Sequence, residues 1–178
     1  MLLLMPFLRA QVGSAATGDK NELRANLLYL IEGTAEITYE RLAGERLGLG
    51  ASAYVVLRKG GMKFFGDSYP WNFSIHPFAR FYFGNPRGKG FFLEGNLMLG
   101  ADTQALPDTG YRGNTEWGFG LGMAYGGKWV LGNNWVAEVY VGFGYTDLWD
   151  TPDEGYLFDD LFDIWVYPRF GITIGKRF

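Results

Sequence analysis

The chain has 178 residues, a formal net charge of −3 at pH 7, 27 glycines and no cysteine. A hydrophobic content of 48% excludes a disordered chain, and the lack of cysteine excludes a disulfide framework and thiolate metal ligands. The absence of excess positive charge argues against nucleic acid as a partner. The length suggests one domain, and the high glycine content favours an all-β fold because interior glycine weakens helices.

The first ten residues, MLLLMPFLRA, resemble the apolar core and cleavage region of a secretory leader, although the usual positive start is missing. We expect residues 1–10 to be a truncated signal peptide, with a short apolar tail as the alternative. Residues 11–20 are small and polar and predict a short lead-in. Residues 21–178 are expected to form the folded domain.

Beyond residue 20, apolar and polar residues alternate with a period of two, and turn-rich stretches separate the alternating segments. In 72–83, for example, Phe73, Ile75 and Phe81 share one face. His76 and Arg80 lie on the other face. The pattern predicts strands in residues 23–29, 35–40, 47–58, 72–83, 91–100, 116–125, 134–143 and 164–174.

The distribution of charge over the two faces indicates which one points outward. The apolar faces carry large residues and almost no charge, and the opposite faces are rich in glycine. A membrane barrel turns its apolar face outward, whereas a soluble, lipocalin-like barrel turns it inward. We therefore predict an all-β fold, an eight-stranded antiparallel up-and-down transmembrane β-barrel with a filled polar lumen. A soluble barrel or sandwich is the alternative. Aromatic residues near strand ends fit membrane interfaces, namely Tyr39, Phe83, Trp117 and Trp135.

The polar faces predict the side chains that fill the lumen. An eight-stranded barrel is just wide enough for its own side chains, so interior Arg and Glu must pair to offset the cost of desolvation. We expect a structural plug, with a proton or ion path as the alternative. The only histidine, His76, is interpreted as a hydrogen-bonded lumen residue; a catalytic role beside Ser74 or Glu94 is the alternative. The expected lumen residues are Arg24, Glu36, Glu40, His76, Arg80, Glu94, Glu116, Glu138 and Arg169.

The connections between the predicted strands differ in length. Residues 43–46, 84–89 and 126–133 are expected to form short turns on the periplasmic side, where both chain ends lie. On the outer side we expect one tight turn at residues 32–33. The three long outer loops are 59–71, 101–114 and 145–163.

The last outer loop, 145–163, contains seven acidic residues, no Lys or Arg, and several aromatic residues. It predicts either a folded surface cap or a docking surface. The docked partner would be a protein or, through divalent cations, lipopolysaccharide. The residues of this possible docking surface are Trp149, Asp150, Phe158, Asp159, Asp160 and Phe162.

The final segment, YPRFGITIGKRF, alternates apolar positions and ends in an aromatic residue. It resembles the C-terminal assembly signal of outer-membrane barrels, which implies the Bam insertion machinery as a partner during assembly. Lys176 departs from that pattern, in which an apolar or aromatic residue is usual. The signal residues are Phe170, Ile172, Ile174 and Phe178.

The stretches NELRANLLYLIEGTAEITYERL and SIHPFARFYFGNPRGKGFFLEGNLMLG resemble a family of uncharacterised small outer-membrane proteins of Bacteroidota-type bacteria. The resemblance covers residues 21–178 and implies an architecture like the OmpA transmembrane domain and OmpX, in contact with lipid and lipopolysaccharide of a Gram-negative outer membrane. It transfers no catalytic residue. We expect a structural or partner-binding barrel, or an accessory subunit of a larger complex, that is not an enzyme and has no cofactor or metal. The alternatives are a lipid-modifying enzyme and a narrow channel for small hydrophobic solutes.

Overall fold

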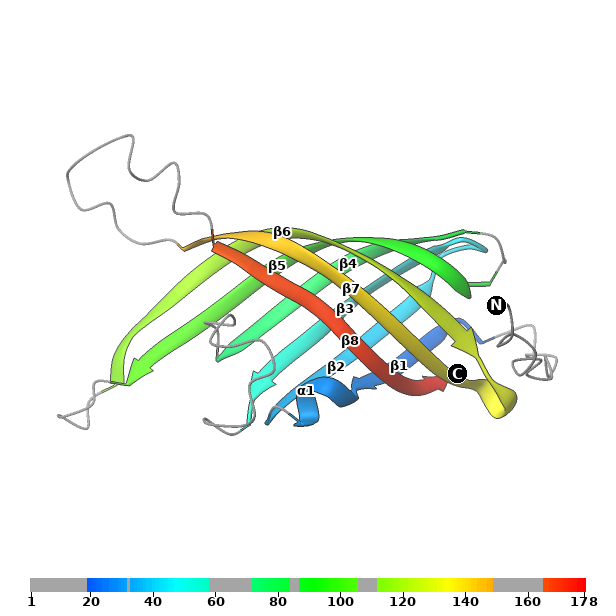
Figure 1. Cartoon of the computed structure of the whole chain (residues 1–178), viewed down its shortest axis with the longest axis horizontal. Helices are drawn as coiled ribbons and strands as arrows, with labels where there is room; N and C mark the ends of the chain where they lie inside the picture. Colours follow the sequence, from blue (N-terminus) through cyan, green and yellow to red (C-terminus); the bar gives the residue numbers. More distant parts are fainter. Residues whose placement is uncertain (1–18, 32, 58–71, 84–86, 106–111, 149–164) are drawn as a thin grey trace, which may run out of the picture.

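The computed structural model describes residues 19–31, 33–57, 72–83, 87–105, 112–148 and 165–178. These ranges contain a five-residue helix, α1 (Leu27–Ile31), and a 3-10 turn at Gly132–Asn134. No helix within them is long and apolar enough to cross a membrane. The strands are β1 (Asn21–Asn26), β2 (Thr34–Leu42), β3 (Leu47–Val56), β4 (Phe73–Phe83), β5 (Gly90–Ala105), β6 (Arg112–Val130), β7 (Trp135–Leu148) and β8 (Trp165–Arg177) (Figure 1).

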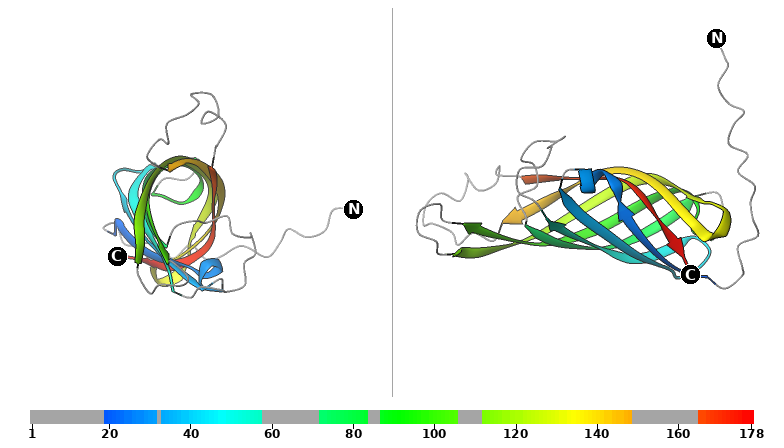
Figure 2. Two further views of the ribbon diagram at one scale, coloured as in Figure 1. Left: turned by 90° about the vertical axis from the view of Figure 1, so that its left-hand side faces the viewer. Right: turned by 90° about the horizontal axis from the view of Figure 1, so that it is seen from below.

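The strands form one closed sheet. Each strand pairs antiparallel with the next along the chain, and β8 returns to pair with β1. Seen from one end, the strands make a ring (Figure 2). The prediction of an all-β, closed, eight-stranded antiparallel barrel is confirmed.

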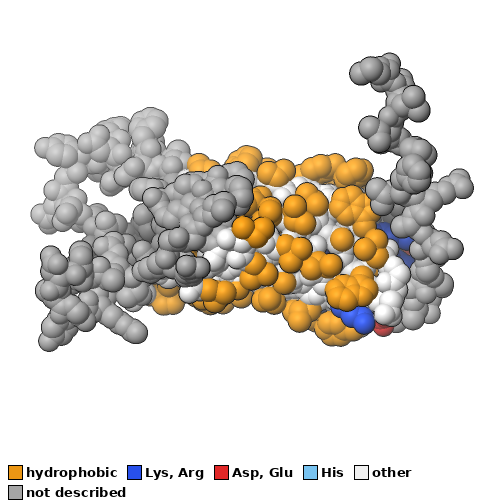
Figure 3. Space-filling view, turned by 60° about the horizontal axis from the view of Figure 1, so that its bottom comes forward, with side chains coloured by type: hydrophobic (Ala, Val, Ile, Leu, Met, Phe, Trp, Pro, Cys, Tyr) orange, Lys and Arg blue, Asp and Glu red, His pale blue; other side chains and the backbone are white. Residues whose placement is uncertain are grey.

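Burial in this barrel is the reverse of that in a soluble ligand-binding barrel. Along β4, exposed and buried side chains alternate almost without exception, as the period of two predicts. The exposed faces carry large apolar side chains such as Leu121 and Val141, and the interior holds charged ones such as Glu40 and Arg80. Apolar side chains cover the described part of the barrel wall in the view of Figure 3.

Interior glycines make room for interior aromatic rings. A Cβ atom added to Gly126 would lie 2.6 Å from Cβ of Tyr140 and 2.7 Å from Cζ of Phe92. Contacts this short do not occur between real side chains, so a larger residue here would displace a ring. The glycine-rich polar faces therefore fit a narrow barrel that is filled by its own side chains.

Several strands are longer than the sequence indicates. β6 continues through residues 126–130, which were predicted as a turn, and the connection to β7 is residues 131–134. Residues 101–105, 112–114 and 145–148, predicted as outer loops, belong to β5, β6 and β7. The strands are longer because backbone pairing continues. β5 and β6 stay paired up to Ala105↔Arg112, with a register irregularity between Thr103 and Ala105. Small and polar residues here resemble a loop in sequence, but the neighbouring strand keeps them extended.

The first strand is shorter than predicted, and this leaves a seam in the barrel wall. Pairing between β1 and β8 ends at Asn26↔Thr173, whereas β7 stays paired with β8 as far as Thr146↔Trp165. Residues 165–172 of β8 therefore have no paired β1 residue on that side, and α1 contacts β8 there at Phe170. The predicted strand 23–29 would place Tyr29 on the outer face with Leu23, and this placement is wrong, because Tyr29 lies in α1 and is 3% exposed.

Tyr29 and Asn26 fill the seam. The Tyr29 ring packs edge-on against Tyr54 at 5.3 Å and against Phe170 at 5.1 Å between ring centroids. The Asn26 side-chain amide donates to the carbonyl of Phe170 at 3.2 Å. Backbone groups of alternate β8 residues point toward β1, as those of Phe178 do. The backbone of Pro168 has the same orientation. Because proline has no N–H, Pro168 presents no unpaired hydrogen-bond donor at the β8 edge that lacks β1.

Candidate functional site in the barrel interior

The barrel interior brings most of the predicted polar residues together. Glu116 belongs to β6, but its side chain lies outside the described part of the structure. All the other predicted lumen residues are buried, none with more than 2% of its surface exposed: Arg24, Glu36, Glu40, His76, Arg80, Glu94, Glu138 and Arg169.

Sequence reasoning missed three interior charges, Glu22, Lys128 and Arg177, which are also buried. The sequence predicts a turn at Lys128, and Arg177 lies in the segment that resembles the C-terminal assembly signal. Glu22 lies two residues before Arg24 and therefore on the same face of β1, so the period of two already contained the signal for it.

Glu40 is the acceptor at the centre of the interior network. Its Oε2 atom accepts from Arg24 Nη2 at 2.8 Å, Arg80 Nη1 at 3.0 Å and Lys128 Nζ at 2.9 Å. Its Oε1 atom accepts from the hydroxyl of Tyr82 at 2.5 Å. One buried carboxylate from β2 is therefore surrounded by three cations from β1, β4 and β6.

Glu22 extends the network toward the end of the barrel where the turns are short. It accepts from Lys128 Nζ at 2.8 Å and from Arg177 Nε at 2.8 Å, and it also pairs with Arg24. The Arg177 guanidinium donates in addition to the carbonyls of Arg87 and Gly88, each at 3.0 Å. Arg177 thus links the last strand to the turn between β4 and β5.

Arg80 and Arg169 extend the network toward the opposite end. Arg80 donates to Glu94 and to Glu138, each at 2.7 Å. Arg169 donates to Glu94 at 3.0 Å and to Glu36 at 2.5 Å. The Arg80 guanidinium also lies over the ring of Phe92, with its carbon 4.4 Å from the ring centroid.

The buried charges that the structure describes balance. Among the described residues, five buried carboxylates face five buried cations, and each makes an ion pair of 3.0 Å or less. Such pairing offsets the cost of removing the charges from water, and removal of one partner leaves its opposite charge uncompensated. The charge-assisted hydrogen bonds form a continuous network, and its chemical role is to hold the strands together.

His76 lies in the same interior. Its Nε2 atom is 2.9 Å from Oγ of Ser74, and its ring lies 5.8 Å from that of Tyr167. A nucleophile and base require substrate access as well as contact, and both Ser74 and His76 are 0% exposed. The contact fits a hydrogen-bonded lumen histidine. The described residues contain no group of three or more side chains suited to holding a metal ion.

The remaining predicted residues lie on the outer wall or outside the described ranges. Ile172 and Ile174 of β8 and Phe178 just after it are exposed, and Phe170 is half-buried beside α1. The residues of the possible docking surface, Trp149, Asp150, Phe158, Asp159, Asp160 and Phe162, lie outside the described residues.

A family model described as a protein of unknown function (DUF3575) matches residues 1–156. No curated protein and no solved structure matches the chain.

Proposed function

The chain belongs to the DUF3575 family of proteins of unknown function, and from its geometry we propose that it is an integral outer-membrane barrel with a structural or partner-binding role. The observation that carries this proposal is the inverted burial: apolar side chains cover the wall and paired charges fill the interior. In water, such a wall would leave a very large apolar surface exposed. In a bilayer, the closed sheet satisfies its backbone and the apolar wall contacts hydrocarbon.

The dimensions of the wall support the same proposal. On β7 the outward side chains run from Trp135 through Val139, Val141 and Phe143 to Tyr145, and all five are exposed. This interval matches the roughly 9–11 residues that a tilted strand needs to cross a bilayer. Aromatic residues at both ends of an apolar stretch are typical of interfacial girdles.

The filled interior supports a non-catalytic, non-transporting role. A channel for small hydrophobic solutes would need an apolar path, whereas the described interior is lined by ion pairs. A lipid-modifying enzyme built on His76 would need this side chain to face lipid, and it is buried. The proposed partners are outer-membrane lipid and lipopolysaccharide, the Bam machinery during assembly, and a protein that contacts the loop containing Trp149 and Asp150. The sequence resemblance supports a Gram-negative, Bacteroidota-type outer membrane and kinship with OmpA and OmpX barrels.

The first test of the proposal is the behaviour of the purified protein. We expect it to require detergent, and we expect its folded band to shift on a gel after boiling. A protein that stays soluble without detergent and shows no shift would refute the membrane proposal. Pull-down from native membranes in a gentle detergent then distinguishes the roles: a stoichiometric partner indicates a subunit, and a barrel recovered alone indicates a self-contained structural protein.

A charge placed on the outer wall gives a sharper test. Val141, near the middle of the apolar stretch of β7, is 65% exposed. In phospholipid vesicles, we expect Val141→Arg to lower the free energy of unfolding by about 2–4 kcal/mol, because the charge enters hydrocarbon. Urea unfolding followed by tryptophan fluorescence measures this change.

Two control variants separate charge from other effects. Val141→Ala removes the side chain without adding charge, and Ala43→Arg places the same charge on the exposed turn between β2 and β3. We expect both controls to cost less than Val141→Arg. On a wall that faces water, all three substitutions would be nearly neutral, and that result would contradict the proposal.

A further inference from the structure

Charged side chains that are exposed or half-buried surround the end of the barrel with the short turns, and we call this set the basic rim. Around this basic rim, six cations face only two acids, Asp19 and Glu45, which leaves a formal charge of +4 in a chain whose total is −3. Every other described charged side chain is buried in the balanced interior. The cations of the basic rim are Lys20, Arg41, Arg46, Arg87, Lys89 and Lys176.

The backbone of the basic rim is held in place by hydrogen bonds between neighbouring turns. The carbonyl of Glu45 accepts from the backbone N–H of Arg87 at 2.6 Å and from that of Gly88 at 3.2 Å. The carbonyl of Arg46 accepts from the N–H of Tyr82 at 2.8 Å. From the inside, Arg177 donates to the carbonyls of Arg87 and Gly88. The turns that carry the cations are therefore tied to one another.

Of the two acids of the basic rim, Asp19 is already engaged. Its Oδ2 atom accepts from the side-chain amide of Asn134 at 2.5 Å. The amide is neutral, so Asp19 keeps its charge and the net charge of the basic rim stays at +4.

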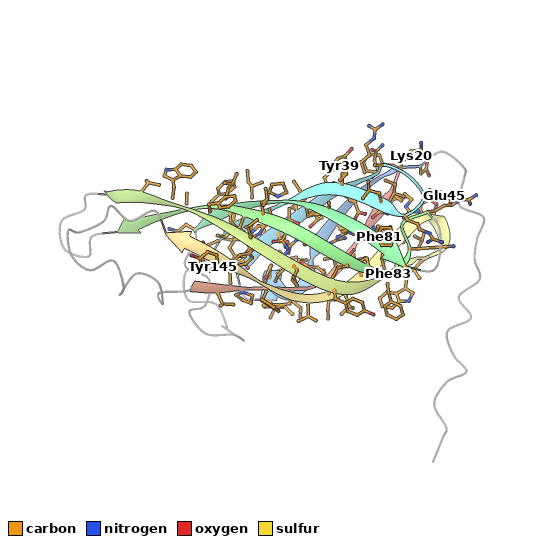
Figure 4. All side chains as sticks on the ribbon, turned by 90° about the horizontal axis from the view of Figure 1, so that it is seen from above. Lys20, Tyr39, Glu45, Phe81, Phe83 and Tyr145 are labelled. Atoms are coloured by element: carbon orange, nitrogen blue, oxygen red, sulfur yellow. The ribbon has the colours of Figure 1, made fainter. Side chains whose placement is uncertain are left out.

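The basic rim adjoins the aromatic edge of the apolar wall. Lys176 is outward on β8 and lies opposite Trp135 of β7, and Arg41 follows the outward Tyr39 on β2 by one strand repeat. Figure 4 shows Tyr39, Phe81 and Phe83 at the same end as Lys20 and Glu45. Aromatic girdles lie at the level of lipid headgroups, and long basic side chains beside them reach toward the phosphates. The cations therefore lie where a membrane presents its phosphate groups.

We propose that the basic rim binds the phosphate groups of anionic phospholipids in the leaflet at the short-turn end of the barrel. This inference rests on the proposed function, since it requires the apolar wall to lie in a bilayer. Each cation near an anionic membrane surface strengthens the association by about fivefold. Screening by salt weakens this attraction within a Debye length, so the preference for anionic lipid falls as ionic strength rises.

The test compares two lipids that differ in headgroup charge. The protein is folded into phosphatidylcholine vesicles, and quenching of its tryptophans by brominated phosphatidylglycerol is compared with quenching by brominated phosphatidylcholine. Trp129 and Trp135 lie at the short-turn end and are exposed, so they report on lipid at the basic rim. We expect preferential quenching by phosphatidylglycerol at low salt. The triple variant Arg41→Gln, Arg46→Gln and Lys176→Gln should lose most of this preference.

Matched variants and a second anion make the outcomes decisive. Arg41→Lys keeps the charge and should keep the preference, and Glu45→Gln removes an acid from the same rim and should not weaken it. Equal quenching by both lipids, or a preference that survives in the triple variant, would overturn the inference. Inorganic phosphate that abolishes the preference, where chloride of equal ionic strength does not, would identify a free-phosphate site and also overturn it. Failure to enter phosphatidylcholine vesicles or to shift on boiling would instead refute the proposed function.

Discussion

Replacing Glu40 by glutamine should lower the free energy of unfolding by about 3–5 kcal/mol, the cost of removing one partner from a buried ion pair. The effect is large because Arg24, Arg80 and Lys128 all donate to the same carboxylate oxygen. Glutamine has nearly the same shape and still offers a carbonyl oxygen, so the variant tests the charge more than the packing. Urea unfolding in vesicles or detergent micelles measures the change.

The matched control for this variant is Glu45→Gln, the same substitution on the exposed turn after β2. Exposed ion pairs contribute about 0–1 kcal/mol, so we expect little change there. Glu40→Gln leaves the described interior with one more cation than carboxylates, although each cation keeps another carboxylate partner. The double variant Glu40→Gln with Lys128→Met restores the charge balance and should recover part of the stability. If Glu40→Gln were as mild as Glu45→Gln, the carboxylate would not be the acceptor that holds the network together.

The sequence predicted the faces of the strands well, because a side chain in a strand can point in only two directions. A segment such as 72–83 alternates so regularly that Ser74, His76 and Arg80 had to share a face, and the structure places all three inside. The paired interior also follows from physics, since a narrow barrel leaves no room for unpaired charge. Which glutamate contacts which arginine does not follow, because it depends on the register between strands.

The ends of the strands were predicted poorly for a related reason. Gly126 and Gly127 read as a turn, but pairing with β7 at Gly126↔Tyr140 and beyond keeps them in β6. This error also hid Lys128, which lies on the interior face two residues after Gly126. Local sequence reports the preference of a segment by itself, whereas a neighbouring strand decides how far pairing continues.

The helix α1 was not predicted because LLYLI carries no local signal for it. Its residues Leu27–Ile31 continue an apolar run from β1, and so short a segment fits a strand as well as a helix. What distinguishes the two is tertiary: the Tyr29 ring lies between Tyr54 of β3 and Phe170 of β8. Packing of Tyr29 therefore replaces β1–β8 backbone pairing at this part of the barrel wall.

Replacing Tyr29 by alanine should accordingly lower the free energy of unfolding by about 3–5 kcal/mol, the usual cost of deleting a buried aromatic side chain. Tyr29→Phe keeps the ring and should retain most of the stability. Leu30→Ala, on the exposed face of the same helix, controls for a general weakening of α1 and should cost much less. Urea unfolding of the three variants in the same vesicles measures these differences. Equal effects of Tyr29→Ala and Leu30→Ala would mean that the ring does not close the seam, and that the barrel tolerates an open edge along β8.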